Sequence, residues 1–303
     1  MKEAKKGNIV KYNKWGYIFL IPFVVVYLVF QVYPLVSTIF FSFFEYYEEN
    51  LAVVGPTWNN FEHYIQIFSD GSIVKYAENT IIMWLMGFIP QILVSLLLGA
   101  WFSDTRLHLK AAGFFKAVIY LPNLIMASAF AMLFFTLFAS SGPINSILVD
   151  LKILDQPFRF LENILATRTL VAFMNFIMWF GNTTILLMAG MMGIDPSLFE
   201  AAEVDGATST QVFFRITLPL LRPILVYVAI TSLVGGLQMF DVPEILTEST
   251  GDPNECAKTL IMYLNSQISV SKNYGLAGAI SVVLFVLTGA LSMLVFWVTN
   301  KKE

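Results

Sequence analysis

Six long and almost entirely apolar stretches alternate with shorter polar segments along the chain. A helix needs about 20 mostly apolar residues to cross a bilayer, and it satisfies its own backbone N–H and C=O groups where lipid offers no partner. The pattern predicts an all-α, polytopic membrane helix bundle with about six transmembrane helices in one domain, residues 16–299, between terminal segments 1–15 and 300–303. The predicted spans are Gly16–Phe44, Tyr76–Phe102, Phe114–Ala139, Leu170–Met192, Pro223–Val242 and Tyr274–Thr299.

The composition excludes an ordinary soluble domain, because 57% of the residues are apolar and only 13% are charged, against roughly 25% charged in soluble chains. Cytoplasmic loops retain Lys and Arg, so the placement of these residues predicts orientation. With the amino terminus inside, the cytoplasmic side holds Lys2, Lys5, Lys6, Lys11, Lys14, Arg106, Lys110, Lys116, Arg215, Arg222, Lys301 and Lys302. The opposite side holds only Lys75, Lys152, Arg159, Arg168, Lys258 and Lys272. Both termini are therefore predicted to be cytoplasmic.

The first apolar stretch, Gly16–Phe44, follows a basic amino terminus and could be read as a signal peptide. The apolar region of a signal peptide is only about 7–15 residues long and ends at small residues. This stretch is about twice as long and ends in Phe-Ser-Phe-Phe, which favours a retained span. Pro22 and Pro34 each remove one helix hydrogen bond, which a bundle tolerates.

The sequence offers no pattern for catalysis or metal binding. Cys256 is the only cysteine, and His63 and His108 are the only histidines, too few for a disulfide or a metal cluster. The chain contains no phosphate-binding Gly-x-x-x-x-Gly-Lys-Ser/Thr run, no Gly-x-Ser-x-Gly elbow and no His-Glu-x-x-His pair. We expect a non-catalytic protein with no cofactor, no metal ion and no nucleic-acid partner.

A polar segment of about residues 193–219 lies between the fourth and fifth predicted spans. Asp195 can cap a short helix, and Pro196 suits its first turn. Ser197 and Glu200 have the spacing of a capping box. These signals predict a short helix that projects from the membrane domain.

The same segment contains two further signals. Gly206 can adopt the left-handed conformation that ends a helix. A second short helix, about Thr208–Arg215, can then return the chain to the membrane. The sequence therefore predicts a helix–turn–helix that projects into the cytoplasm.

This segment resembles the EAA loop of ATP-binding-cassette importer permeases, in which Glu-Ala-Ala is followed after three residues by Gly and later by Ile-x-Leu-Pro. The matching residues are Glu200-Ala201-Ala202, Asp205-Gly206-Ala207 and Ile216-Thr-Leu-Pro219. The rest of the chain resembles the carbohydrate-uptake branch of that family, the maltose and glycerol-3-phosphate type, and in particular the longer permease of its pair. The stretches concerned are Leu20-Ile-Pro22, Tyr33-Pro34, Ser42-Phe43, Asn60-Phe61, Asn79-Thr80, Leu121-Pro122, Gly142-Pro-Ile-Asn145 and Tyr274-Gly275. One departure follows the fifth span, where Glu248–Pro253 replaces the family's Gly-Gly-Pro.

The resemblance implies that the loop is a coupling helix for a separate ATPase subunit. Its coupling residues would be Glu200, Ala201, Ala202, Asp205 and Gly206. Small alanines permit close helix approach, and the acidic groups can bind basic or backbone donors on the partner. The alternative is a solvated loop whose acidic residues only interact with a helix dipole.

The resemblance also implies the partners and the place of the protein. They are two ATP-binding-cassette ATPase subunits, which hydrolyse the ATP, a second homologous permease and an extracytoplasmic solute-binding protein. The protein would span the cytoplasmic membrane of a bacterium or archaeon several times. Its expected function is to form, with the second permease, the translocation path for a sugar or oligosaccharide.

Two spans carry polar stripes, and polar groups in a membrane usually face the bundle or a water-filled path. On the fourth span, Asn175, Trp179 and Asn182 share one helical face. On the fifth, Gln238 and Asp241 share a face with Thr231 and Gly235. Amides and a carboxylate can bind sugar hydroxyls, and an indole can cover a pyranose ring. The stripes predict a sugar pathway near the middle of the membrane.

The alternative is that these polar residues bond helix to helix. Trp84, Gln91 and Ser95 share a face on the second span as well, and nothing in the sequence separates a lining role from a packing role there.

Two other function classes remain open. A self-contained secondary transporter or channel would place ionisable residues deep in several spans, and the span centres contain almost none. A membrane enzyme would need a catalytic constellation, which the chain lacks. The identity of the solute stays open, since phosphodiester-linked polyols use similar permeases.

Overall fold

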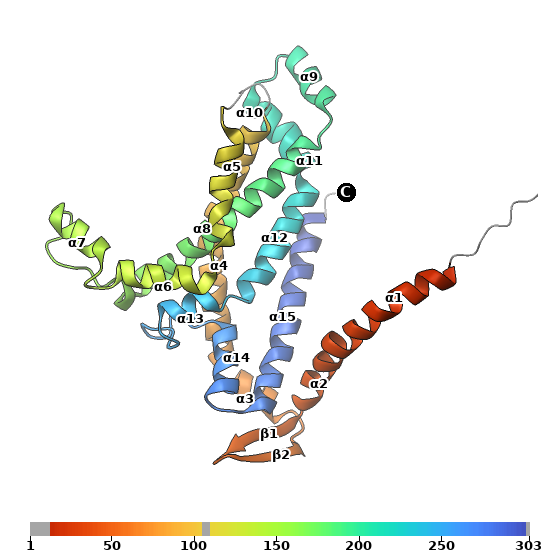
Figure 1. The fold of residues 1–303 in the computed structure, drawn as a ribbon, viewed down its shortest axis with the longest axis vertical. Helices are drawn as coiled ribbons and strands as arrows, with labels where there is room; N and C mark the ends of the chain where they lie inside the picture. Colours follow the sequence, from red (N-terminus) through yellow and green to blue (C-terminus); the bar gives the residue numbers. More distant parts are fainter. Residues whose placement is uncertain (1–12, 105–109, 301–303) are drawn as a thin grey trace, which may run out of the picture. The chain divides into compact units, whose positions relative to one another are not determined.

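The computed structural model describes residues 13–104 and 110–300, and most of these residues are helical (Figure 1). Among them, six helical segments are long and apolar enough to cross a membrane. They are Lys14–Phe41, Ser72–Ser103, Ala127–Asp150, Ile164–Met192, Arg222–Leu246 and Tyr274–Thr299. The predicted class, an all-α polytopic membrane bundle, is confirmed. The predicted terminal segments 1–15 and 300–303 lie almost wholly outside the described residues.

The chain divides into two compact units, which are described separately. The smaller unit contains the residues up to Gln66 together with Gln267–Val283, and the larger contains Ile67–Ser266 together with the residues from Leu284 on. The elements that begin in the first stretch of the smaller unit are α1 (Asn13–Tyr27), η1 (Leu28–Val32), α2 (Tyr33–Phe41), β1 (Phe44–Glu49), β2 (Ala52–Trp58) and α3 (Glu62–Ser69).

The first predicted span is helical from Asn13 to Phe41, with a π-helical segment, η1, before its second proline. There the N–H of Tyr33 bonds to the carbonyl of Leu28, one residue further back than in an α-helix. Pro34 follows at the start of α2 and has no N–H to donate. The wider turn accommodates this proline without ending the helix.

A two-stranded antiparallel hairpin follows α2, and the sequence reasoning missed it. Strands β1 and β2 pair from Phe44 with Trp58 to Glu49 with Ala52. The two turn residues, Asn50 and Leu51, both have positive φ, as in the turns that suit hairpins. The last residue of the predicted span Gly16–Phe44 therefore belongs to a strand.

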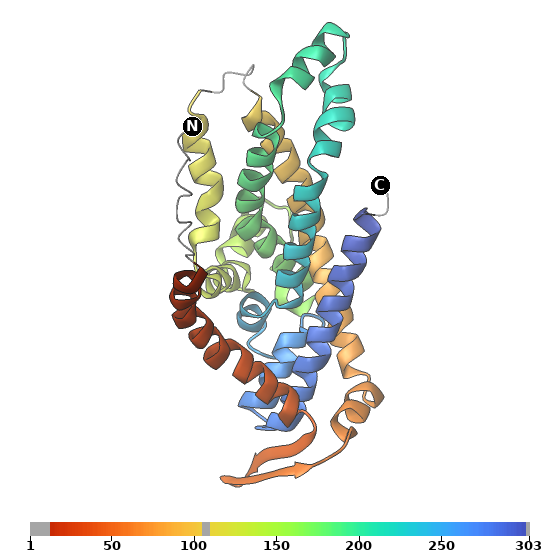
Figure 2. The same ribbon diagram turned by 90° about the vertical axis from the view of Figure 1, so that its right-hand side faces the viewer.

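The larger unit is built on two long helices that lie against each other, α4 (Ser72–Ser103) and α8 (Ile164–Met192) (Figures 1 and 2). The elements between them are α5 (Ala112–Tyr120), η3 (Leu121–Leu124), α6 (Ala127–Phe138), α7 (Pro143–Asp150) and η4 (Phe160–Glu162). Those after α8 are α9 (Pro196–Val204), α10 (Ser209–Val212), η5 (Phe213–Thr217), α11 (Leu218–Leu220), α12 (Arg222–Leu237), α13 (Asp241–Leu246), α14 (Leu260–Ser269) and α15 (Tyr274–Asn300). Helices α14 and α15 each contribute residues to both units.

Close packing and buried hydrogen bonds join α4 to α8. A Cβ atom on Gly87 would lie 2.8 Å from the carbonyl oxygen of Ala172, so only glycine allows this approach. Gln91 donates a buried hydrogen bond of 2.8 Å to the hydroxyl of Thr183. Small residues and interhelical hydrogen bonds of this kind commonly stabilise the packing of membrane helices.

The third predicted span, Phe114–Ala139, was wrong as a single helix. It comprises α5, the short segment η3 and α6, with extended backbone at Ile125 and Met126. Pro122 is one cause, since it cannot donate the helical hydrogen bond at its position. Asn123 bonds to the backbone carbonyl of Met178 on α8, which holds the break in place.

The fifth predicted span, Pro223–Val242, is also interrupted. Helix α12 ends at Leu237, and α13 begins only at Asp241. Phe240 has φ −138° and ψ −64°, outside the helical region. The break leaves the intervening backbone to find partners elsewhere.

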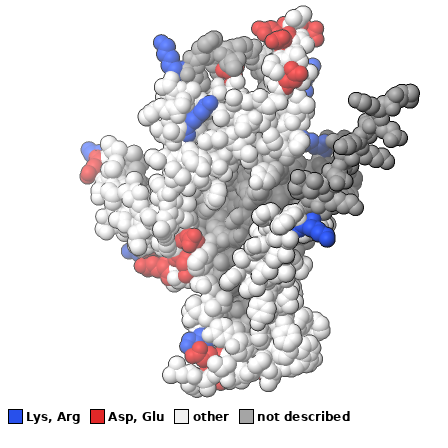
Figure 3. Space-filling view, turned by 45° about the vertical axis from the view of Figure 1, so that its right-hand side comes forward, with Lys and Arg blue, Asp and Glu red and all other residues white. Residues whose placement is uncertain are grey.

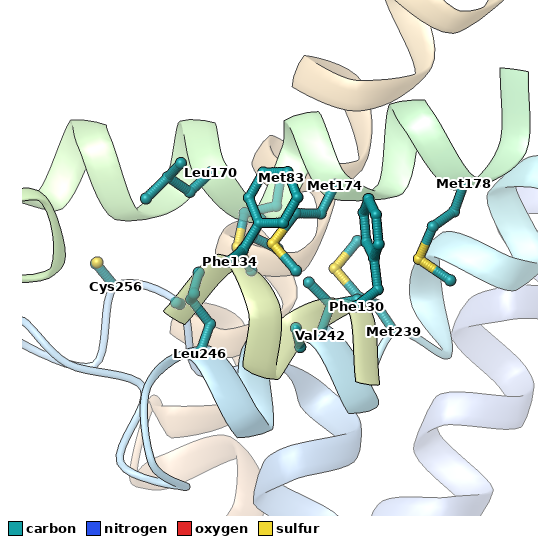
Figure 4. Packing of buried hydrophobic residues seen from close by; sticks show 13 residues of the cluster. Met83, Phe130, Phe134, Leu170, Met174, Met178, Met239, Val242, Leu246 and Cys256 are labelled. Carbon is teal, nitrogen blue, oxygen red and sulfur yellow. The ribbon is translucent and has the colours of Figure 1, made fainter. Parts of the chain in front are cut away.

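The apolar core of the larger unit lies between α4, α6, α8 and α13 and is rich in methionine (Figure 4). Its members include Met83, Met174, Met178, Met239, Phe130, Phe134, Leu170, Val242, Leu246 and Cys256. The methionine side chains are unbranched and adapt to irregular gaps. The buried core therefore reaches the break between α12 and α13 through Met239.

Candidate coupling loop and translocation pathway

Helix α9 forms at the place that the capping signals predict. The Asp195 carboxylate accepts a hydrogen bond of 2.9 Å from the backbone N–H of Ser197. Hydrogen bonds from the Ser197 backbone and then from its side chain lower the pKa of Asp195. Pro196 begins the helix. The predicted capping box of Ser197 with Glu200 was wrong, because Asp195 occupies the N-cap position and so places Leu198, rather than Glu200, three residues later.

Gly206 ends α9 in a left-handed conformation with φ +74°, as predicted. The N–H of Ala207 bonds to the Ala202 carbonyl at 2.9 Å, and the N–H of Gly206 bonds to the Glu203 carbonyl at 3.0 Å. This pair of bonds is a Schellman motif. No atom of the described residues lies within 4 Å of a Cβ built on Gly206, so the constraint comes from the backbone conformation and not from space.

The second short helix begins one residue later than predicted and is shorter than Thr208–Arg215. Thr208 is the N-cap of α10 and forms a capping box with Gln211. The chain then passes through the π-helical segment η5 into α11 and α12. The capping-box chemistry expected at the first helix is thus found at the second.

The predicted coupling residues lie together on a projecting segment at one end of α8. Glu200, Ala201, Asp205 and Gly206 are exposed, whereas Ala202 is buried. Figure 3 shows acidic side chains gathered at the tip that carries α9. The exposed groups are free to contact another protein.

Two apolar side chains of α9 were missed by the sequence reasoning. Val204 is 88% exposed and Leu198 is 42% exposed. Val204 lies three residues after Ala201 and four after Glu200, so the three share a helical face. An exposed valine on this face adds apolar contact area to the acidic groups. Its signal in the sequence was a hydrophobic residue directly before the Asp-Gly turn.

The polar stripe of the fourth predicted span touches the break between α12 and α13 through Asn175. The Asn175 amide donates to the Val171 carbonyl at 2.9 Å and lies 3.5 Å from the sulfur of Met239. Gln238, which directly precedes Met239, is exposed. The structure thus brings the start of one stripe next to the other.

The remaining residues of the predicted pathway are accessible to differing degrees. Trp179 is 48% exposed, Asn182 is half-buried and Asp241 is exposed. Thr231 bonds back to the carbonyl of Tyr227 on its own helix. No atom lies within 4 Å of a Cβ built on Gly235, which leaves room along the stripe of α12.

The polar residues of the second span have packing roles. Trp84 donates to the hydroxyl of Ser232 at 3.1 Å, and Ser95 donates to the Phe180 carbonyl at 2.9 Å. Gln91 is buried and bonds to Thr183. For this face the helix-to-helix alternative is correct.

A polar cluster at the other end of α8 was not anticipated. We call it the Glu255 clasp, and it consists of Lys75, Tyr76, Asn79, Arg168, Glu255 and Lys258. Its basic members, Lys75, Arg168 and Lys258, were interpreted only as charges on the outer side, and no sequence pattern signals that they meet Glu255. Lys258 and then Lys75 donate hydrogen bonds that lower the pKa of Glu255 from 4.5 to about 2. This contribution to stability is present above pH 4.5 and is lost only as the pH falls through about 2.

The described residues contain no group of three or more His, Cys, Asp or Glu side chains that could hold a metal ion. The predicted site residues of the two spans and of the loop are amides, one indole, exposed acidic groups and small residues.

A family model described as the binding-protein-dependent transport system inner membrane component matches residues 10–299. The chain belongs to this family. The resemblance to importer permeases is confirmed, and with it the assignment as a non-catalytic membrane subunit served by a separate ATPase. A self-contained secondary transporter and a membrane enzyme are both ruled out as readings of this chain.

Similar proteins in this family carry related descriptions. The lactose transport system permease protein LacF of Rhizobium radiobacter is 27% identical, with 96% of each chain covered. The arabinooligosaccharides transport system permease protein AraP of Bacillus subtilis is 30% identical over 92% of this chain and 86% of its own. A bacterial ABC transporter involved in the import of the acidic polysaccharide alginate has the same fold, with a TM-score of 0.79, 24% identity and coverage of 97% and 98%. It has also been solved in complex with an alginate pentasaccharide-bound periplasmic protein.

Proposed function

We propose that this permease subunit translocates a sugar or oligosaccharide. The observation that carries the proposal is the contact at a helix break between Asn175, a member of one polar stripe, and Met239, the residue next to Gln238 of the other stripe. Such a place offers polar groups within an apolar protein, which is the composition of a site for small polar ligands. Relatives of similar length are described as permeases for lactose and arabinooligosaccharides, which favours a saccharide over other solutes.

The proposed solute contacts follow from the chemistry of each side chain. Asn175, Asn182 and Gln238 supply amide donors and acceptors for hydroxyl groups, and Asp241 supplies a carboxylate acceptor. The half-exposed Trp179 offers an apolar face on which a sugar ring can stack. The methionines beneath the site let it adapt to rings of different shape.

The proposed assembly contains a second homologous permease, two ATP-binding-cassette ATPase subunits and an extracytoplasmic solute-binding protein. The family description supports the binding protein directly. The projecting segment with α9 is the proposed contact with an ATPase subunit, through Glu200, Ala201, Ala202, Asp205 and Gly206. Its short helix ends in a rigid Schellman turn, which suits a surface that must transmit movement.

Uptake by the assembled transporter tests the proposed substrate class. The complex is purified through this chain, reconstituted with its binding protein, and offered labelled lactose, an arabinooligosaccharide and a glycerol phosphodiester. We expect ATP-dependent accumulation of at least one saccharide. Accumulation of the phosphodiester alone would exclude the saccharide assignment while leaving the permease role intact.

The proposed topology places both termini and the segment 193–219 in the cytoplasm. Much of the Lys and Arg evidence for it lies outside the described residues, including Arg106 and Lys301. Additional support comes from α8, since its last residue leads into this segment while Arg168, near its start, bonds to the carbonyl of Cys256. A helix of 29 residues is about 40 Å long, enough to separate the two sides of a membrane.

Cysteine labelling tests this topology in intact cells. In a Cys256→Ala background, Ser209→Cys is expected to react with an impermeant reagent only after the membrane is opened. Leu151→Cys is the matched control, because Leu151 is 65% exposed and belongs to the opposite side in the same topology. Labelling of Ser209→Cys from outside, with Leu151→Cys protected, would reverse the orientation.

A further inference from the structure

The break between α12 and α13 depends on a partner from a distant loop. Four residues after Met239 stands Pro243, which has no N–H, so the Met239 carbonyl would lack its backbone partner even in a continuous helix. In the structure it accepts a buried hydrogen bond of 2.8 Å from the hydroxyl of Thr259. Thr259 has no exposed surface. Without the Thr259 hydroxyl this carbonyl would lose its side-chain partner, so Thr259 stabilises the observed arrangement of the chain at the break.

The position of Thr259 is fixed by helix α4. The backbone N–H of Leu260, the next residue, bonds to the hydroxyl of Thr80 on α4 at 3.3 Å. The amide of Asn79 donates to the carbonyl of Lys258 at 3.2 Å. Residues on both sides of Thr259 are thus bonded to adjacent residues of α4.

Asn79 also connects this loop to α8. Its amide oxygen accepts a hydrogen bond of 2.6 Å from Arg168, and its amide nitrogen donates to the Glu255 carbonyl at 2.8 Å. Arg168 in turn donates to the Cys256 carbonyl at 3.0 Å. Asn79 is only 4% exposed and both ends of its amide are paired. A fully paired buried network of this kind specifies one arrangement.

Glu255 closes the network and balances its charge. Lys75 and Lys258 bond to its two carboxylate oxygens at 2.7 Å and 2.8 Å, and the hydroxyl of Tyr76 lies 3.1 Å from both oxygens. Without this carboxylate, the two ammonium groups would repel each other across the same space. The negative charge of Glu255 is therefore needed to hold the two ammonium groups of the clasp together.

We propose that the Glu255 clasp is a positioning device for the translocation pathway. By holding residues 255–260 on α4 and α8, it places the Thr259 hydroxyl against the Met239 carbonyl. That contact sets the break from which Gln238 and Asp241 project. The effect on transport rests on the proposed function, because it requires Gln238 to contact the solute, whereas the effect on position does not.

A fluorine label on the break measures position directly. In the assembled complex, with Cys256→Ala, a trifluoromethyl probe is attached to Gln238→Cys and followed by NMR. We expect one narrow resonance in this parent, and a shifted or additional resonance in Glu255→Gln and in Thr259→Val. Thr259→Ser, which keeps the hydroxyl, is expected to match the parent. Arg159→Gln is the matched control, because it removes an ion pair of the same unit whose partners are 71% and 62% exposed.

Transport kinetics provide the second readout, with Gln238 left in place. Uptake of labelled lactose is measured, or of the arabinooligosaccharide if that is the panel member taken up. Glu255→Gln and Thr259→Val are each expected to raise the half-saturating concentration roughly tenfold, the effect of one lost buried hydrogen bond. Basal ATP hydrolysis stays unchanged. The double variant is expected to be no worse than the stronger single variant, since both changes act through one contact.

An unchanged fluorine spectrum in Thr259→Val and Glu255→Gln would overturn the proposal. A changed spectrum with unchanged uptake would keep the positioning role and instead contradict the solute contact of Gln238. If Glu255→Gln fails to assemble, Thr259→Val against Thr259→Ser decides alone, because valine keeps the shape of threonine without its hydroxyl, whereas serine keeps the hydroxyl without the methyl group.

Discussion

Replacing Gly206 by valine is expected to abolish most of the ATP hydrolysis that the binding protein stimulates, while the subunit still inserts and assembles. Gly206 has φ +74°, where a residue with a Cβ atom is destabilised by roughly 1–2 kcal/mol, and a β-branched residue by more. The Schellman bonds that end α9 need this conformation. A helix that ends differently presents Glu200 and Val204 in another direction. We therefore expect the stimulation of ATP hydrolysis by the binding protein to fall by about tenfold or more.

Two variants separate backbone conformation from side-chain volume. Gly206→Asn is expected to retain much of the stimulation, because asparagine tolerates the left-handed region better than other L-residues. Gly113→Val adds the same side chain within α5, where nothing in the described part of the chain lies within 4 Å of the new Cβ, and is expected to have little effect. The measurement is ATP hydrolysis by reconstituted complexes with and without the binding protein.

Charge reversal at the same surface is an independent test of the coupling role. Glu200→Lys leaves the fold of α9 intact, since Glu200 is exposed and outside the observed caps, and it is expected to weaken contact with the ATPase subunit. Full stimulation in both Gly206→Val and Glu200→Lys would mean that the segment is a solvated loop without a coupling role.

Trp179→Ala and Gln238→Ala are expected to raise the half-saturating solute concentration by about tenfold or more, because a lost polar partner leaves buried groups unpaired at roughly 1–3 kcal/mol each. Removing the indole deletes the only aromatic member of the two stripes. Assembly with the ATPase and basal hydrolysis should persist, since both side chains are largely exposed. The measurement is concentration-dependent uptake by reconstituted transporters.

Trp101→Ala is the control for this pair of variants. Trp101 is 54% exposed and lies two residues before the end of α4, outside both stripes, and its loss is expected to leave uptake unchanged. Loss of assembly in Trp179→Ala would favour a packing role for the stripe. Unchanged uptake in both stripe variants would remove these residues from the pathway.

The spans and the projecting loop could be predicted because their signals are local. Length and hydropathy give the helices, and Asp195, Pro196 and Gly206 act on their own backbone. The β-hairpin could not be predicted, because its turn at Asn50 and Leu51 lacks the usual Asn-Gly pair, its first strand mixes acidic and aromatic residues, and its second strand contains Gly55 and Pro56. The break at Pro122 had a visible cause, but a proline in a membrane span is compatible with either a kink or an interruption.

The candidate site shows where sequence reasoning stops. Gln91 and Asn182 are both amides on polar stripes of membrane helices. Gln91 meets Thr183 across the interface of α4 and α8, whereas Asn182 lies half-buried beside that contact. The difference depends on which helix is the neighbour, and spacing along one helix does not contain that information. The same holds for the Glu255 clasp, whose members come from three separate parts of the chain.

Helix α8 gives the larger unit a fixed internal scale. It runs without interruption over 29 residues, and its rise of 1.5 Å per residue places Trp179 about 20 Å from Met192 and about 17 Å from Arg168. The projecting loop, the polar stripe and the clasp therefore all lie at successive positions along this one uninterrupted helix. Since Gly87 lets α4 pack tightly against the side of α8, α8 resists bending. A turn of α8 about its own axis would thus move all three at once and by the same angle.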